Sequence, residues 1–371
     1  MPEWFDQPPW FVAVGFVAVG FWAMMKGADL LVEGGVVIAK RYQLSMAVIG
    51  ATIVAFGTSL PELVVSVGSV LMGAAELAAE QDAGLLSVRP SADGEAAIAI
   101  ANIVGSNIFN IGAILGSAAL LTPLAISRST KRLDFPLMLL VFGVFVVFCL
   151  PFDGSETGTI TRPEALVLVV GLIAFTVFAI KFGKVDPDEV PDADASQGML
   201  KASAWIVLGI LLLTAGGKLA LNGGVALAAT FGMSERLIGL TVMAVGTSLP
   251  ELLTSIQAAR KGHADLAVAN VVGSNLFNVL CIVGISGLVL PLPVPAAVVS
   301  WDFLWMAGFA VLLAPFIYSR RGLKRGGGAL LLAGLIAFVV TTLLFTNRQP
   351  GTEAPTSASP ASLSSQSMPA D

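Results

Sequence analysis

The sequence GTSLPE occupies residues 57–62 inside a long apolar run, and the same six residues return at 246–251. Proline lacks a backbone N–H, so the carbonyl group four residues before it loses its helical hydrogen-bond partner. That carbonyl belongs to the glycine of each motif, and glycine lets the backbone open. A glutamate deep in a membrane helix is costly unless it is paired, so an unpaired one is functional by default. Each motif therefore predicts an interrupted helix with a functional carboxylate, Glu62 in the first copy and Glu251 in the second.

The composition around these motifs is that of an integral membrane protein. Of 371 residues, 56% are apolar and 12% are charged, and the mean hydropathy is +0.87; soluble domains carry about 25% charged residues. Apolar runs of about 20 residues, long enough to cross a bilayer as helices, recur along the chain. His263 is the only histidine and both cysteines lie in apolar runs, so the sequence offers no Cys/His metal cluster.

The apolar runs, separated by polar and helix-breaking residues, predict ten membrane-spanning helices. They lie near residues 10–39, 44–72, 97–121, 133–151, 162–182, 202–229, 234–259, 264–290, 295–318 and 329–346. Of the 20 Lys and Arg residues, 14 fall in or beside the connections that follow the odd-numbered helices, and 4 fall on the other side. By the positive-inside rule, this distribution predicts that the odd-numbered connections are cytoplasmic and that both termini lie outside.

The motif is part of an internal repeat. Residues 20–62 align without a gap on residues 209–251, at a constant offset of 189, and 18 of the 43 positions are identical. A second pair follows at an offset of 168, ANIVGSNIFN at 101–110 and ANVVGSNLFN at 269–278. Each half then holds five spans, so the two halves enter the membrane with opposite polarity. Inverted repeats with interrupted helices are typical of transporters whose site lies near the bilayer midplane.

These features predict an all-α integral membrane protein, with ten transmembrane helices in two inverted five-helix repeats. We expect the first repeat over 1–182, a cytoplasmic linker over 183–201, the second repeat over 202–346 and a disordered tail over 347–371. The two offsets differ because of an acidic loop insertion at about 73–96, which could concentrate cations, although a solvated loop is the plainer interpretation. The linker is also acidic, but it lacks the residue spacing of an EF-hand, so we interpret it as solvated rather than as a calcium site.

The second motif supplies polar groups that face the first. Asparagine and serine recur every four residues, which places them on one helix face; the two sets are Asn102, Ser106 and Asn110, and Asn270, Ser274 and Asn278. Such residues can simply hold helices together, and Gly105 and Gly273 would permit close helix approach. Beside two buried glutamates, however, they form a set of hard oxygen ligands without imidazole or thiolate. This set suits Ca²⁺, Na⁺ or Mg²⁺ and disfavours zinc or copper.

The charge of the site predicts exchange. Two carboxylates neutralise one Ca²⁺, and without a cation they would repel each other. Another cation must therefore enter before the site can cross the membrane again, which predicts obligatory exchange rather than a channel.

Two copies of GTSLPE, each followed by GSNxFN, resemble the cation/calcium antiporter superfamily, and within it the prokaryotic sodium/calcium exchangers. The resemblance implies that Glu62 and Glu251 bind Ca²⁺ and that Asn110 and Asn278 lie at the centre of the site. It further implies backbone oxygen ligands from Ala55, Thr58, Ala244 and Thr247, and sodium sites lined by Ser59, Ser106, Ser248 and Ser274. The resemblance also implies that the first helices of the two halves slide against a fixed core.

One position departs from the family pattern. Several sodium/calcium exchangers, and especially the potassium-dependent ones, carry aspartate where this chain has Asn278. The amide makes potassium co-transport less expected, and it leaves a proton-coupled calcium antiporter of the same fold as the alternative function. An enzyme is not expected, because GTSLP lacks the GxSxG pattern and the spans contain no histidine base.

The sequence thus predicts a secondary antiporter that exchanges Ca²⁺ for Na⁺ by alternating access in the cell (inner) membrane. Its expected partners are these ions and the lipid bilayer. We expect no cofactor, no nucleic acid and no required protein partner.

Overall fold

The computed structural model describes residues 8–82, 95–151, 158–183, 198–233, 242, 244–294 and 298–346. The acidic part of the predicted linker, the tail and residues 83–94 of the predicted loop insertion lie outside the described residues. One compact unit extends to Leu335, and the chain from Ile336 onward forms a second unit that we describe by itself, as the last part of a helix that ends at Thr346.

The first half of the chain is helical through each predicted span. Its elements are α2 (Trp10–Tyr42), α3 (Met46–Ile49), η1 (Gly50–Val54), α4 (Ala55–Thr58), α5 (Leu60–Asp82), α6 (Glu95–Phe109), η2 (Asn110–Leu115), α7 (Gly116–Leu121), η3 (Thr130–Asp134), α8 (Phe135–Phe148), β1 (Thr159–Ile160) and α9 (Arg162–Phe182). The η segments are single turns of π-helix, which appear mostly as bulges inside α-helices and often at functional sites. The loop predicted at 73–96 is partly helical, because α5 continues to Asp82 and α6 begins at Glu95.

Over the described residues, the second half repeats the order of the helices. Its elements are α10 (Met199–Thr230), α12 (Ala244–Thr247), α13 (Leu249–Arg260), α14 (Ala264–Phe277), η6 (Asn278–Val283), α15 (Gly284–Val289), β2 (Leu292–Pro293), η7 (Val298–Asp302), α16 (Phe303–Tyr318) and α17 (Arg325–Thr346). Strand β2 precedes η7 and α16, whereas β1 follows α8. The short strands β1 and β2 pair in antiparallel register. The π-helical segments η2 and η6 begin at repeat-related asparagines, and η3 and η7 end at repeat-related aspartates, Asp134 and Asp302.

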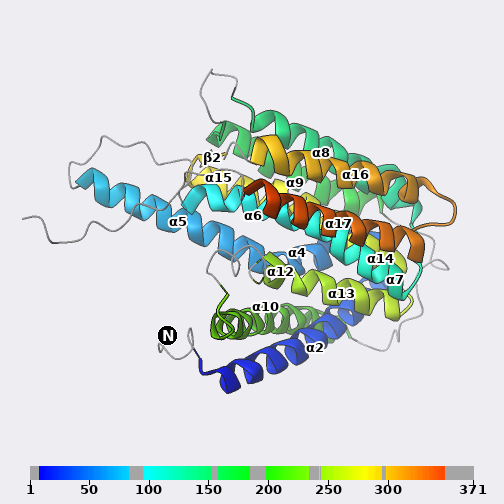
Figure 1. Ribbon diagram of the computed structural model, residues 1–371. Coiled ribbons are helices and arrows are strands. Elements are labelled where there is room, and N and C mark those ends of the chain that lie inside the picture. Colours follow the sequence, from blue (N-terminus) through cyan, green and yellow to red (C-terminus); the bar gives the residue numbers. More distant parts are fainter. Residues whose placement is uncertain are drawn as a thin grey trace, which may run out of the picture. The chain divides into compact units, whose positions relative to one another are not determined.

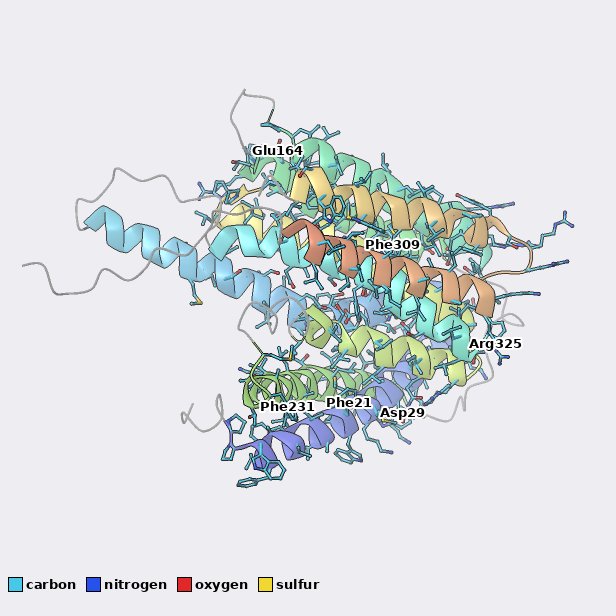
Figure 2. All side chains as sticks on the ribbon, viewed as in Figure 1. Phe21, Asp29, Glu164, Phe231, Phe309 and Arg325 are labelled. Carbon is cyan, nitrogen blue, oxygen red and sulfur yellow. The ribbon has the colours of Figure 1, made fainter. Side chains whose placement is uncertain are left out.

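This is a mostly helical, multi-pass membrane protein. Among the described residues, seven helices are long and apolar enough to cross a membrane, and the bent pair Met46–Thr58 and Leu60–Met72 makes an eighth. The predicted spans 133–151 and 234–259 contain α8 and α12–α13, but these do not meet the same standard of length and composition. Exposed apolar side chains cover the outer faces of the helices, as expected in lipid, and include Phe21 on α2 and Phe231 at the end of α10 (Figure 2).

Helices α2 and α10 lie side by side, and glycines bring their backbones together (Figure 1). A Cβ atom on Gly20 would lie 2.6 Å from the carbonyl oxygen of Gly216, and one on Gly27 would lie 2.7 Å from that of Gly209. These contacts run in opposite directions along the two helices, so the pair is antiparallel. The contacts are also reciprocal, because Gly209 is the repeat partner of Gly20 and Gly216 is that of Gly27.

The motif helices cross the buried helices of the second motif at small residues. Within the span Ala264–Val289, a stretch of 18 residues is buried throughout. A Cβ on Gly273 would lie 2.6 Å from the Cα of Ala51, which confirms the predicted close approach at this glycine. No described atom lies within 4 Å of a Cβ on Gly105, and the repeat partner of Ala51, Leu240, lies outside the described residues.

Candidate ion-binding site

Each motif helix breaks at its serine, immediately before the Leu-Pro pair. Ser59 has φ −83° and ψ 5° between α4 and α5, and Ser248 has φ −92° and ψ 7° between α12 and α13. In the first copy the helix axis bends by 46° at this point. The glutamates that follow, Glu62 and Glu251, lie in the first turns of α5 and α13. The two sequence motifs therefore make the same local structure, an interrupted helix with a carboxylate just after the break.

The motif glycines have a packing role that the sequence did not indicate. A Cβ on Gly57 would lie 2.8 Å from Cγ1 of Ile210, and one on Gly246 would lie 2.6 Å from Cδ1 of Leu221. Both of these large side chains belong to α10. A larger residue than glycine would thus require the side chain of Ile210 or Leu221 to shift, in addition to any effect on backbone opening.

The two glutamates are buried, and each is bonded to the serine of the other motif. Ser59 Oγ donates to Glu251 Oε1 at 3.0 Å, and Ser248 Oγ donates to Glu62 Oε1 at 3.4 Å. Glu62 is 0% exposed and Glu251 is 1% exposed. The contacts bring the motif helices of the two halves together, although 189 residues separate the motifs in the sequence.

The site presents oxygen atoms that no protein group satisfies. In the described part of the chain, 11 buried side-chain polar atoms lack a hydrogen-bond partner, and 6 of them belong to the predicted site. These six are Glu62 Oε2, Glu251 Oε2, Asn110 Oδ1, Asn278 Oδ1, Thr247 Oγ1 and Ser274 Oγ. Leaving a buried polar group unpaired costs about 1–3 kcal/mol, and more for a charged group. Each of these six oxygens is therefore available to a bound cation.

The donor set contains two carboxylates and otherwise neutral oxygens. Over the described residues, no group of three or more His, Cys, Asp or Glu side chains lies close enough to hold a metal ion. The two carboxylates and the neutral oxygens match hard cations, and this donor set lacks the nitrogen and sulfur ligands of zinc or copper sites.

In the second motif, the serine of the first copy contacts a serine–glutamate pair, and the last asparagine of the second copy contacts that serine. Ser106 Oγ lies 3.2 Å from Ser248 Oγ and accepts a hydrogen bond from Asn278 Nδ2 at 3.1 Å. Ser274 is fully buried. Ser106 therefore links the second motif of the first half to the glutamate motif of the second half.

The first position of each stripe, by contrast, holds helices together. Asn102 Nδ2 donates to Ser66 Oγ at 3.4 Å, and its repeat partner Asn270 donates to Ser255 Oγ at 3.0 Å. Thr58 Oγ1 also lies 3.5 Å from Asn270 Oδ1. These hydrogen bonds agree with the plain packing interpretation for Asn102 and Asn270.

The predicted central amides are each oriented by another asparagine. Asn110 Nδ2 donates to Asn275 Oδ1 at 3.0 Å, and Asn278 Nδ2 donates to Asn107 Oδ1, also at 3.0 Å. Asn107 and Asn275 are fully buried. Neither asparagine is predicted from the sequence, because the four-residue spacing of the stripe skips them, although each belongs to the repeated GSN triplet.

The predicted backbone ligands lie in the short helices before the breaks. The Ala55 carbonyl oxygen accepts from the Ser59 N–H at 3.0 Å and from Thr58 Oγ1 at 3.3 Å. Ala244 is the first residue of α12 and Thr247 is the last. The side chains of Thr58 and Thr247 are buried.

Two ion pairs of Lys261 join α2 to the turn between α13 and α14. Lys261 Nζ lies 3.0 Å from Asp29 Oδ1 and 2.8 Å from Glu33 Oε1, and Asp29 is labelled on α2 in Figure 2. Burial lowers the pKa of Lys261, but its hydrogen bonds to Glu33 and Asp29 outweigh burial, so the pKa is raised. Asp29 and Glu33 on α2 therefore share a cation from the second half of the chain.

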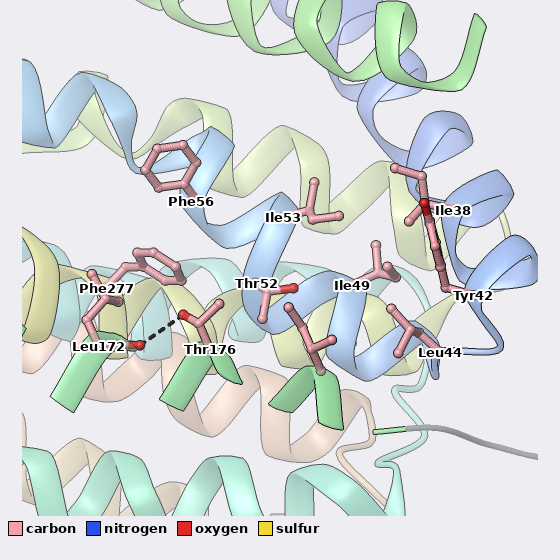
Figure 3. A pocket seen from close by; sticks show the side chains of 11 residues that line it. Ile38, Tyr42, Leu44, Ile49, Thr52, Ile53, Phe56, Leu172, Thr176 and Phe277 are labelled. Carbon is pink, nitrogen blue, oxygen red and sulfur yellow. Dashed lines mark hydrogen bonds between the residues drawn. The ribbon is translucent and has the colours of Figure 1, made fainter. Parts of the chain in front are cut away.

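A separate apolar cavity of 730 Å³ lies between α9, the end of α2 and the first motif helix (Figure 3). Its lining residues are Ile38, Tyr42, Leu44, Ile49, Thr52, Ile53, Phe56, Leu172, Thr176, Ile180 and Phe277. None of the predicted ion ligands lines it, so the cavity is distinct from the site. Phe56 and Phe277, whose ring centroids are 5.8 Å apart, line both this cavity and a smaller hollow that reaches Ser59.

Comparisons with known proteins match the chain in both halves. The family described as sodium/calcium exchanger protein matches residues 12–181 and 201–344. The sodium/calcium exchanger MaX1 of Methanosarcina acetivorans is 30% identical over 365 residues, covering 89% of this chain and 98% of that protein. The inner membrane protein YrbG of Escherichia coli is 29% identical over 338 residues, covering 88% and 96%. The solved structure of the sodium-calcium exchanger NCX_Mj, soaked with 10 mM Na⁺ and no Ca²⁺, aligns at a TM-score of 0.72 and 26% identity, covering 90% of this chain and 99% of that one.

Proposed function

The chain belongs to the sodium/calcium exchanger family, and from this premise we propose that it is a secondary antiporter that exchanges Ca²⁺ for Na⁺ by alternating access. The family membership supports a membrane antiporter for calcium and other cations rather than an enzyme. The observation that carries the specific proposal is the reciprocal pairing of the two motifs. Ser59 donates to Glu251 and Ser248 to Glu62, while the second oxygen of each glutamate has no partner among the described residues.

In this proposal the two glutamates hold Ca²⁺ together. Their two negative charges balance one Ca²⁺, and each offers an unpartnered Oε2. Ca²⁺ takes six to eight oxygen ligands at about 2.3–2.6 Å. Amide oxygens of Asn110 and Asn278, and backbone oxygens of the alanine and threonine in each motif, can supply the remainder; those four residues are Ala55, Thr58, Ala244 and Thr247.

Sodium ions use the edges of the same site. The serines that bond the glutamates, Ser59 and Ser248, have hydroxyl oxygens that can also accept a cation. Ser106 and Ser274 extend this set on the second motif. Because Na⁺ and Ca²⁺ then share the glutamates, binding of one ion opposes binding of the other, which is the requirement for exchange.

The driving ion distinguishes the proposal from its nearest alternative, a proton-coupled calcium antiporter of the same fold. Both functions require the paired glutamates. Two observations favour sodium coupling. A proton carrier does not require the four serine hydroxyls, and the chain is similar to proteins named sodium/calcium exchangers. Asn278 in place of an aspartate leaves about two formal charges in the site and argues against potassium co-transport.

We propose that the protein has ten membrane helices in two inverted halves, 1–182 and 202–346, with a linker over 183–201 and a tail over 347–371. The repeat-related positions of the π-helical segments support the repeat, and the antiparallel glycine contacts of α2 with α10 support its inversion. The Lys and Arg distribution supports termini outside the cell membrane. The related inner membrane protein supports a location in that membrane.

Transport of ⁴⁵Ca²⁺ into sodium-loaded proteoliposomes tests this function, with external Na⁺, K⁺ and pH varied separately. The proposal expects uptake that requires internal Na⁺, is inhibited by external Na⁺ and is indifferent to K⁺. Uptake that ignores the sodium gradient but follows a pH gradient would favour the proton-coupled alternative. Calcium flux without any counter-ion would point to a channel.

A further inference from the structure

Behind the proposed site, each central asparagine begins a chain of hydrogen bonds that ends on a methionine. Asn110 Nδ2 donates to Asn275 Oδ1 at 3.0 Å, and Asn275 Nδ2 lies 3.6 Å from Sδ of Met138 on α8. All three side chains are fully buried. The methionine belongs to neither sequence motif, so nothing in the motifs marks it.

The second half contains the same chain. Asn278 Nδ2 donates to Asn107 Oδ1 at 3.0 Å, and Asn107 Nδ2 lies 3.9 Å from Sδ of Met306 on α16. Met306 is 168 residues after Met138, which is the offset that also relates the asparagines. The arrangement therefore occurs twice, at repeat-related positions on different helices.

The thioether group determines the direction of the hydrogen bonds in each of these two series. A thioether sulfur accepts weak hydrogen bonds and cannot donate them, so it selects the nitrogen end of the adjacent amide. When Asn275 turns its Nδ2 toward Met138, its Oδ1 must face Asn110. Asn110 then donates with its own nitrogen, and its Oδ1 is left for the site, where it has no partner among the described residues. The same reasoning runs from Met306 through Asn107 to Asn278.

We propose that Met138 and Met306 are positioning residues that fix the direction of the two central amide oxygens toward the transported cation. This inference rests on the proposed function, because it assumes that a cation binds between Glu62 and Glu251. If the methionines served packing alone, leucine would replace them with little effect, since Leu and Met have similar volumes. Without the sulfur, the outer amide can rotate and present its nitrogen to the central one, which turns the central oxygen away.

The two sides differ in how many bonds hold the central amide. Asn278 Nδ2 also donates to Ser106 Oγ at 3.1 Å, whereas the contact found for Asn110 Nδ2 among the described residues is with Asn275. The Met306 contact is also the longer of the two. Loss of the sulfur should therefore have a larger effect at Met138 than at Met306.

The test measures Ca²⁺ affinity by isothermal titration of the purified full-length protein in detergent, together with its melting temperature without Ca²⁺. We expect Met138→Leu to weaken binding about tenfold and Met306→Leu about threefold, within or below the range found for outer-shell partners of metal ligands. Met138→Gln retains an acceptor of similar reach and should restore most of the affinity. Met46→Leu replaces a buried methionine on α3 that is 3% exposed, and serves as the matched control with unchanged affinity.

The outcomes distinguish the role of the two methionines from the proposed function itself. Leucine variants that bind Ca²⁺ like the wild type would overturn the inference while leaving the proposed function intact. A glutamine variant as weak as the leucine variant, with an equal melting temperature, would also overturn it, because packing and not the acceptor would then matter. Absence of Ca²⁺ binding by the wild-type protein would overturn the proposed function itself, and the inference with it.

Discussion

Ser59, at the break of one motif helix, donates a hydrogen bond of 3.0 Å to Glu251, in the first turn after the break of the other. The repeat-related bond from Ser248 to Glu62 is 3.4 Å long. The two interrupted helices are thus joined through their functional groups, and a cation bound by the glutamates would contact both halves of the protein.

Replacing either glutamate by glutamine should abolish exchange while the protein still folds. Glu62→Gln and Glu251→Gln each leave one negative charge, which cannot balance Ca²⁺, and we expect transport to fall by at least about 100-fold, on the order of 3 kcal/mol. Proteoliposome flux gives the rate, and the melting temperature reports folding. Full activity in either variant would mean that the ion site lies elsewhere.

Removing the serine hydroxyls should affect sodium more than calcium. Ser59→Ala and Ser248→Ala keep both carboxylates but remove a proposed sodium ligand, so the Na⁺ concentration that half-inhibits Ca²⁺ uptake should rise several-fold. Ser69→Ala on α5 is the control, because its hydroxyl donates only to the Ser66 carbonyl of the same helix, at 2.9 Å. An equal loss of Na⁺ and Ca²⁺ affinity in the motif variants would assign these serines to orientation of the glutamates instead.

Adding a charge at the centre should change the selectivity of the site. Asn278→Asp would give three carboxylates, so we expect tighter Ca²⁺ binding and a steeper dependence of transport on pH, since the added carboxyl group can take up a proton. The pH profile of ⁴⁵Ca²⁺ uptake compares the variant with the wild type. A variant with wild-type affinity and an unchanged profile would place Asn278 outside the ion site.

The glycine contacts between α2 and α10 should be sensitive to a single methyl group. Gly20→Ala places a Cβ 2.6 Å from the Gly216 carbonyl oxygen, so one helix must move. We expect destabilisation of about 1–3 kcal/mol, typical of overpacking, measured as a lower melting temperature. Gly15→Ala on the same helix is the control, because nothing lies within 4 Å of its Cβ. Equal melting temperatures for the two variants would contradict the close packing.

The Lys261 ion pairs predict a loss of stability at alkaline pH. The folded-state pKa of Lys261 is raised, since its hydrogen bonds to Glu33 and Asp29 outweigh burial. Its contribution is therefore complete below the unfolded-state pKa of about 10.4 and disappears as the pH rises through the folded-state value. Lys261→Met should lower the melting temperature near neutral pH and reduce its alkaline decline, whereas Lys324→Met, at an exposed position, should do neither.

The sequence predicted the parts of the site that local chemistry marks. Proline, glutamate and serine at fixed spacing identified the breaks and the carboxylates, and the repeat indicated that the two motifs would meet. The partners across helices were not predictable in this way. Lys261 forms ion pairs with Asp29 and Glu33, which lie more than 200 residues earlier in the sequence. The side chain of Ile210 occupies the space that a Cβ atom on Gly57 would need. Asn107, Asn275 and the two methionines lie outside the four-residue spacing, and only tertiary packing brings them to the central amides.

The central claim is that Glu62 and Glu251 bind one Ca²⁺ between them. Crystals of the protein soaked in Ca²⁺, with diffraction measured at a wavelength where calcium scatters anomalously, test it most directly. We expect one anomalous peak at about 2.3–2.6 Å from an oxygen of each glutamate, and loss of that peak when excess Na⁺ is added. A peak at another position, or a peak that touches one glutamate and persists in Na⁺, would contradict it.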